Sequence, residues 1–163
     1  MKDSDFDNWF IKYYSSITPP KLKIRVYLGR NLPAFVVDDF KSVAKIYKII
    51  KISKENEEDA FIYKDALNKK TILFTCDDDF WDDRKFPLHL SPGVIIVKGK
   101  SSDEIDRTIA SFVMDIGFIK NVRLIPGFFL KQKFKINISG YVTKYLTVDR
   151  DEDLARHNYL KEF

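Results

Sequence analysis

The chain has 163 residues, of which 45% are hydrophobic, 15% aromatic and 32% charged, a composition that excludes a disordered chain and predicts one domain with a buried core. The 28 Lys and Arg outnumber the 24 Asp and Glu, and the formal net charge of +4 is compatible with a nucleic-acid partner without requiring one. No apolar run approaches the roughly 20 residues that cross a bilayer, and the polar start lacks a signal-peptide pattern, so we expect a cytoplasmic protein without membrane contact.

The first half of the chain alternates predicted helices and strands. Aromatic residues recur at helical spacing near the N-terminus, and Pro19-Pro20 ends that pattern. Alternating apolar side chains predict strands, and acids in the first turn with lysines in the last turn match a helix dipole. The predicted elements are a helix at 4–16, a strand at 21–28, a helix at 31–43 that opens at Pro33, a strand at 45–53 and a helix at 55–70.

The second half begins with two short apolar strands on either side of an acidic stretch. Ser101 and Glu104 have capping-box spacing and predict the start of a further helix. A period-two pattern with two turn signals then predicts an antiparallel hairpin. The elements are strands at 71–75 and 91–99, a helix at 101–118, a hairpin at about 121–148, and a short helix or frayed end at 149–163.

This order of elements predicts the fold class. Strands that alternate with helices from residue 21 to residue 118 indicate βαβ units, a mainly parallel sheet and helices on both faces. We therefore expect a single α/β domain over residues 1–163, a three-layer α/β/α sandwich to which the N-terminal helix and the hairpin are added. Ligands of such sheets bind at the carboxyl ends of the strands, so the residues after each strand are the first candidates for a site.

Five aspartates follow the third strand in the stretch TILFTCDDDFWDD, residues 71–83. Asp77 and Asp79 come directly after the strand and should lie at its carboxyl end. With one cysteine and two histidines the chain has no ligand set for structural zinc, whereas close carboxylates suit Mg²⁺ or Mn²⁺, which can activate a water to cut a phosphodiester. The alternative is a solvated loop, to which we assign Asp78, Asp82 and Asp83.

Four segments together carry a family resemblance. They read GRNLP at Gly29–Pro33, DAFI at Asp59–Ile62, TCDDDF at Thr75–Phe80 and SPGVII at Ser91–Ile96. In order and spacing they resemble the short PIN-like family related to VapC-type toxins, over about residues 22 to 115. The resemblance implies a metal-dependent ribonuclease, such as the toxin of a toxin-antitoxin pair, with an α/β/α fold. It also implies that the acids Asp59, Asp77 and Asp79 bind Mg²⁺ or Mn²⁺ and that Asn31 supports them.

The chain departs from the family at the first acid. Gly29 stands where the family has that acid, and Arg30 stands at the following acidic position. Losing one carboxylate lowers metal affinity, so a second hypothesis stays open: a catalytically degenerate relative that binds nucleic acid or a protein without cleavage, with Arg30 contacting phosphate. Two of these residues could instead have purely structural roles. Asp59 would complement a helix dipole, and Asn31 would cap the helix before Pro33.

Three lysines near the C-terminus form a second candidate site. The alternation in FLKQKFKINI predicts Lys131, Lys133 and Lys135 on one face of a strand, where they could bind the phosphates of single-stranded RNA. The same pattern is typical of edge strands, whose lysines prevent pairing between molecules. The hairpin and the N-terminal helix could instead form a homodimer or an antitoxin-like partner surface.

Overall fold

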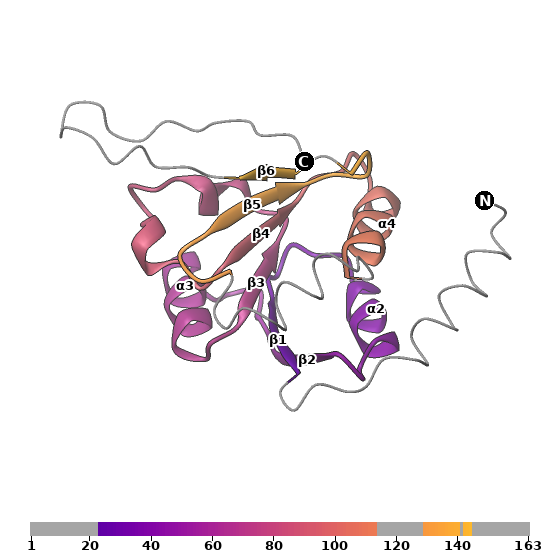
Figure 1. Ribbon diagram of the computed structural model, residues 1–163. Coiled ribbons are helices and arrows are strands. Elements are labelled where there is room, and N and C mark those ends of the chain that lie inside the picture. Colours follow the sequence, from indigo (N-terminus) through magenta and orange to yellow (C-terminus); the bar gives the residue numbers. More distant parts are fainter. Residues whose placement is uncertain (1–22, 114–128, 141, 145–163) are drawn as a thin grey trace, which may run out of the picture.

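The computed structural model describes residues 23–113, 129–140 and 142–144, which form one sheet with helices on both faces (Figure 1). The predicted N-terminal helix at 4–16, the terminal stretch at 149–163 and residues 114–128 lie outside the described residues. The strands are β1 (Ile24–Leu28), β2 (Tyr47–Ile52), β3 (Ile72–Thr75), β4 (Val94–Val97), β5 (Lys133–Ile136) and β6 (Val142–Lys144). The helices are α2 (Val36–Ser42), α3 (Asp59–Asn68) and α4 (Ser102–Val113), with 3₁₀ turns η1 (Asp78–Trp81) and η2 (Leu88–Leu90).

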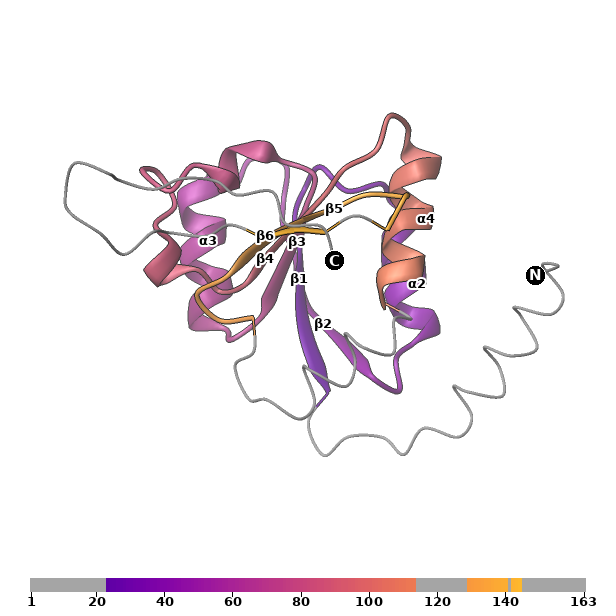
Figure 2. The same ribbon diagram turned by 45° about the horizontal axis from the view of Figure 1, so that its top comes forward.

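The sheet has the strand order β2-β1-β3-β4-β5-β6. Strands β1 to β5 are parallel, and β6 pairs antiparallel with β5. Helices α2 and α4 cover one face of the sheet and α3 covers the other (Figure 2). The prediction of an α/β fold with a mainly parallel sheet is therefore confirmed. Because the chain goes from β1 outward to β2 and then returns past β1 to β3, the strand order reverses between β1 and β3.

Each face of the sheet has its own apolar core. Successive side chains of a strand point to opposite faces, so Val26 packs on the α2 and α4 side while Tyr27 packs on the α3 side. Leu73 and Phe74 of β3 divide in the same way, and all four side chains are buried. Burial on both faces explains why β3 and β4 read as continuous apolar runs instead of alternating ones.

The prediction that three lysines form one accessible face of the last strands is wrong. Lys131 precedes β5, in a turn with φ 59°, and only Lys133 and Lys135 lie in the strand. Lys133 is fully buried and donates a hydrogen bond from Nζ to the carbonyl oxygen of Phe86 at 2.5 Å. Because β5 lies between β4 and β6, it is not an edge strand of the described sheet, and the edge-protection alternative does not apply either. The antiparallel pairing of β5 with β6 does agree with the predicted hairpin.

One carboxyl pair connects the two helices on the same face. The carboxyl groups of Asp39 in α2 and Asp106 in α4 lie close enough to interact, and the buried atoms Asp39 Oδ2 and Asp106 Oδ1 have no hydrogen-bond partner among the described residues. Two carboxyl groups can pair only when a proton lies between them. Burial, followed by the nearby charges of Asp106 and Asp38, raises the pKa of Asp39 to about 8.

We expect the substitution Asp39→Asn to stabilise the fold at about pH 9 and to change little near pH 4. Because the pKa of Asp39 is raised in the folded state, that state keeps a proton that the unfolded chain releases. The free energy of unfolding therefore falls as pH rises from about 4 to about 8. The amide cannot ionise, so the variant should gain on the order of 1 kcal/mol at high pH, a value reduced by solvent screening of this partly exposed group. Urea denaturation across pH measures the difference, with Asp103→Asn on the exposed side of α4 as the control. Identical pH dependence in wild type and variant would contradict the pairing.

Candidate metal centre

The candidate metal centre lies at the point where the strand order reverses. The chain leaves β1 toward α2 on one face and leaves β3 toward η1 on the opposite face, so the two segments separate at the carboxyl ends of neighbouring strands (Figure 1). Open α/β sheets bind their ligands at such a crevice. Gly29 and Arg30 follow β1, and Asp77 follows β3 after one intervening residue, Cys76.

The structure brings together the three acids that the sequence singled out. One carboxylate oxygen from each of Asp59, Asp77 and Asp79 lies within 4.8 Å of the others. Asp59 is the first residue of α3, whereas the other two belong to the turn that follows β3. Asp77 Oδ1 accepts a hydrogen bond from the backbone N–H of Asp79 at 2.9 Å, and Thr75 Oγ1 accepts one from the N–H of Asp77 at 3.1 Å. These bonds hold the backbone of the turn that follows β3. We call Asp59, Asp77 and Asp79 the Asp triad.

The donor set of the Asp triad fits a small divalent cation. Oxygen ligands on opposite sides of an octahedral Mg²⁺ lie about 4.2 Å apart, so a modest rotation of the three side chains would place them around one ion. Asp59 and Asp77 are half-buried and Asp79 is exposed. Burial and then the charge of Asp77 raise the pKa of Asp59, while Arg30 opposes that rise. A cation between the carboxylates would relieve the repulsion that this raised pKa reflects.

Arg30 already supplies one positive charge at the Asp triad. Its Nη2 forms an ion pair with Asp59 Oδ1 at 3.1 Å. Its Nη1 donates hydrogen bonds to the carbonyl oxygens of Glu55 and Glu57, at 3.0 and 2.8 Å. Arg30 therefore connects the end of β1 to the loop before α3, and it occupies one of the two carboxylate oxygens of Asp59.

Gly29 lies in tight packing at the position where the PIN-like family has an acid. A Cβ atom on Gly29 would lie 3.0 Å from Thr75 Oγ1 and 3.1 Å from the carbonyl oxygen of Phe74. Contacts of this length require the neighbouring atoms to move by a few tenths of an ångström. The Thr75 side chain therefore fills the space beside the α-carbon of Gly29 that a larger residue at this position would need.

Asn31 does not perform the capping role considered for it. Helix α2 begins at Val36, and its N-cap position is Phe35, so the predicted start at Pro33 is wrong. The N–H of Val36 bonds to the carbonyl of Pro33, three residues earlier, which makes a turn and not the first turn of the α-helix. Asn31 is exposed in the preceding turn, next to Arg30.

The sequence interpretation missed the roles of the other aspartates in this loop. Asp78 forms ion pairs with Lys98 and Lys135. Asp83 is only 6% exposed and accepts a hydrogen bond from the N–H of Leu88, so its assignment to a solvated loop is wrong. The position of Lys98 at the carboxyl end of the strand predicted at 91–99 was the available signal, since strand ends are where such sheets bind their ligands.

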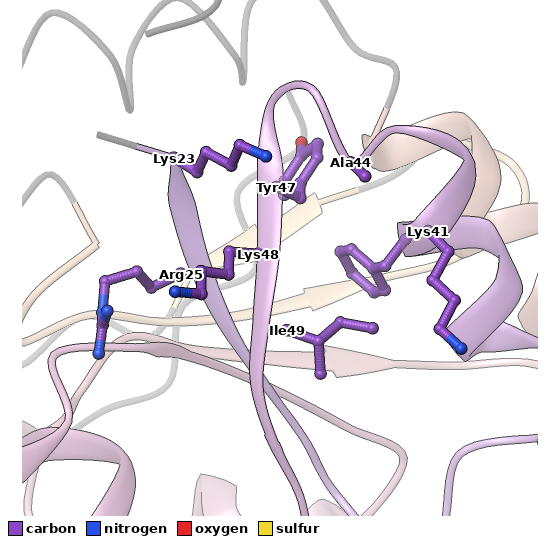
Figure 3. Close-up of a pocket in the computed structure, with 8 residues that line it drawn as sticks. Lys23, Arg25, Lys41, Ala44, Tyr47, Lys48 and Ile49 are labelled. Carbon is purple, nitrogen blue, oxygen red and sulfur yellow. The ribbon is translucent and has the colours of Figure 1, made fainter. Parts of the chain in front are cut away.

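A pocket of about 580 Å³ lies at the opposite end of the strands (Figure 3). Its described lining has four basic and four apolar or aromatic side chains and no acid: Lys23, Arg25, Phe40, Lys41, Ala44, Tyr47, Lys48 and Ile49. Lys23 precedes β1 and Tyr47 begins β2, so this pocket lies at the amino ends of these two strands. It contains none of the site residues that the sequence suggested.

No protein-family model, curated protein or solved structure matches the chain. Membership of the PIN-like family therefore stays a prediction that rests on the four sequence segments. Within the described residues, no helix combines the length and apolar character that crossing a membrane requires.

Proposed function

We propose that the chain is a PIN-like, metal-dependent ribonuclease whose Asp triad holds one Mg²⁺ or Mn²⁺ ion. The observation that supports this most is the convergence of Asp59, Asp77 and Asp79 from two separate segments at the reversal of the strand order. A bound divalent ion would supply an activated water and would stabilise the leaving oxygen of an RNA phosphodiester. The proposal extends to single-stranded RNA as substrate and to an antitoxin as protein partner.

The acids of the triad and the neighbouring Arg30 would have different roles. Asp59 has a raised pKa, so protons and the metal ion compete for its oxygens, and metal affinity should increase with pH as this group ionises. Asp79 is the exposed member and is accessible to a substrate phosphate. Arg30 has a guanidinium fork of the kind that binds phosphate oxygens, and its contact with Asp59 places that fork beside the metal position.

Incubation of the purified protein with a labelled single-stranded RNA and Mn²⁺ tests the proposal. Cleavage that stops on addition of EDTA supports it, provided that calorimetry also shows Mn²⁺ binding to the protein. Absence of both cleavage and heat of binding would mean that the Asp triad is not a metal centre.

A second candidate function has specific support as well. The ion pair of Arg30 with Asp59, together with the crowded position of Gly29, is the arrangement expected if protein cations have replaced the metal. The chain would then bind RNA or a protein partner without cutting. This candidate predicts RNA binding that is the same in EDTA and in Mn²⁺, and no cleavage in either.

We expect Arg30→Met to tighten Mn²⁺ binding by roughly fivefold, because it removes about 1 kcal/mol of repulsion between the guanidinium and the ion. The variant also releases the Asp59 oxygen that Arg30 occupies. Calorimetric titration with Mn²⁺ measures the change. Arg107→Met is the matched control, since Arg107 forms its ion pair with Asp103 on α4, away from the triad. Unchanged or weaker binding in Arg30→Met would show that arginine and metal do not compete.

A further inference from the structure

The turn after β3 directs its consecutive acids to two different places. Asp77 and Asp79 converge with Asp59, whereas Asp78 between them forms ion pairs with two lysines. Asp78 Oδ2 pairs with Nζ of Lys98, and Asp78 Oδ1 lies 3.3 Å from Nζ of Lys135. The lysines come from the next two strands, since Lys98 directly follows β4 and Lys135 lies near the end of β5. The carboxyl edge of the sheet therefore carries a group of two cations directly beside the three acids.

This group keeps a net positive charge. One carboxylate neutralises one of the two ammonium groups, and the structure records no other acid paired with either lysine among the described residues. By contrast, Lys51 contacts two acids, Glu57 and Asp65. An ammonium group has three donors, so Lys98 and Lys135 each keep donors free after their bond to Asp78.

The two lysines are also held in position while remaining accessible. The Lys98 side chain is 43% exposed and that of Lys135 is 28% exposed. Nζ of Lys135 lies 4.6 Å from the ring centroid of Trp81, a contact that fixes the side chain against the last residue of η1. The ion pairs with Asp78 restrain the two ammonium groups as well, so little side-chain freedom remains to be lost when an anion binds.

We propose that Lys98 and Lys135 form a binding site for a backbone phosphate of single-stranded nucleic acid, adjacent to the Asp triad. The choice of nucleic acid as ligand rests on the proposed ribonuclease function. Neighbouring strands lie about 4.8 Å apart, so the ends of β3, β4 and β5 offer a short path along which a backbone would pass from the triad to the lysines. Arg30 at the end of β1 lies on the other side of the triad, and cations would thus flank the acids on both sides.

The test measures binding of a fluorescent oligouridine by anisotropy in EDTA, so that neither metal nor cleavage contributes. The double variant Lys98→Gln/Lys135→Gln should weaken binding at low salt about tenfold, and the slope of log K against log salt should become shallower by about 0.7, the value for one lost phosphate contact on a single strand. The double arginine variant, Lys98→Arg/Lys135→Arg, should retain affinity. Lys64→Gln, an exposed lysine of α3 outside this group, is the control and should retain the wild-type slope. Thermal melting verifies that each variant is folded.

The outcomes separate this inference from the ribonuclease proposal. Loss of RNA affinity in the glutamine variant supports the phosphate site even when the wild type fails to cleave RNA, because the assay contains no metal. Equal affinity and slope in wild type and glutamine variant would overturn the site even when cleavage is observed. If polyglutamate displaces the RNA as effectively as unlabelled RNA does, the nucleic-acid assignment is overturned and the lysines belong to a surface for an acidic protein partner.

Discussion

Asp77→Asn is expected to abolish Mn²⁺ binding by the Asp triad and to reduce RNA cleavage by at least about 100-fold. Loss of a hydrogen-bond partner behind a ligand already costs about 10- to 100-fold in affinity or activity, and loss of a ligand removes both a bond and a compensating charge. The amide keeps an Oδ1 atom that can accept the N–H of Asp79, so the turn after β3 should persist. The change therefore tests the carboxylate and not the fold.

Calorimetry with Mn²⁺ and a cleavage assay on the same preparation provide the measurement. Asp82→Asn is the matched control, because Asp82 ends the same turn but bonds to Arg84 and lies outside the triad. An Asp77→Asn protein that cuts as fast as the wild type would show that any observed cleavage comes from elsewhere, including from a contaminating nuclease.

Lys133→Ala is expected to lower the free energy of unfolding by about 2–4 kcal/mol, the largest stability effect that we predict. Lys133 is fully buried, and its Nζ donates to the carbonyl of Phe86, so truncation leaves both a cavity and an acceptor without this donor. Lys133→Met keeps most of the volume and should cost less than the alanine variant. Urea denaturation of the three proteins gives the comparison.

The pH dependence supplies a second measurement on the same residue. Burial lowers the pKa of Lys133 to about 8, so the folded state releases a proton that the unfolded chain still holds. Wild-type stability should therefore gain a contribution as pH rises from about 8 toward 10, and Lys133→Met should lack it. A Lys133→Ala protein within about 0.5 kcal/mol of the wild type would contradict the burial of this side chain.

The alternation of apolar segments predicted the helices and strands of the core well, but it misjudged the environment of β5. A lysine in a period-two pattern is normally assigned to the solvent face. In this sheet β5 is covered on both faces, and the aliphatic stem of Lys133 lies in the interior while its ammonium group reaches a carbonyl. Sequence periodicity reports which side chains share a face, not whether another layer covers that face.

Part of the candidate site was predictable from the sequence, and part depends on long-range contacts. The convergence of Asp59, Asp77 and Asp79 was predictable, because the strand-end rule selected Asp77 and Asp79 and the family resemblance selected all three. The contact between Gly29 and Thr75 was not, since it depends on β1 and β3 being neighbours in the sheet. The ion pair of Arg30 with Asp59 depends equally on long-range geometry. Such contacts decide how much positive charge the triad already has, which residue types alone do not reveal.

Gly29 and Thr75 bring the ends of two neighbouring strands into close contact. A β-carbon at position 29 would lie 3.0 Å from Thr75 Oγ1 and 3.1 Å from the carbonyl oxygen of Phe74. The same Thr75 hydroxyl accepts the N–H of Asp77. A side chain introduced at position 29 would therefore press on the group that orients Asp77, and a designed centre with a fourth acid at this position would need a matching change at Thr75.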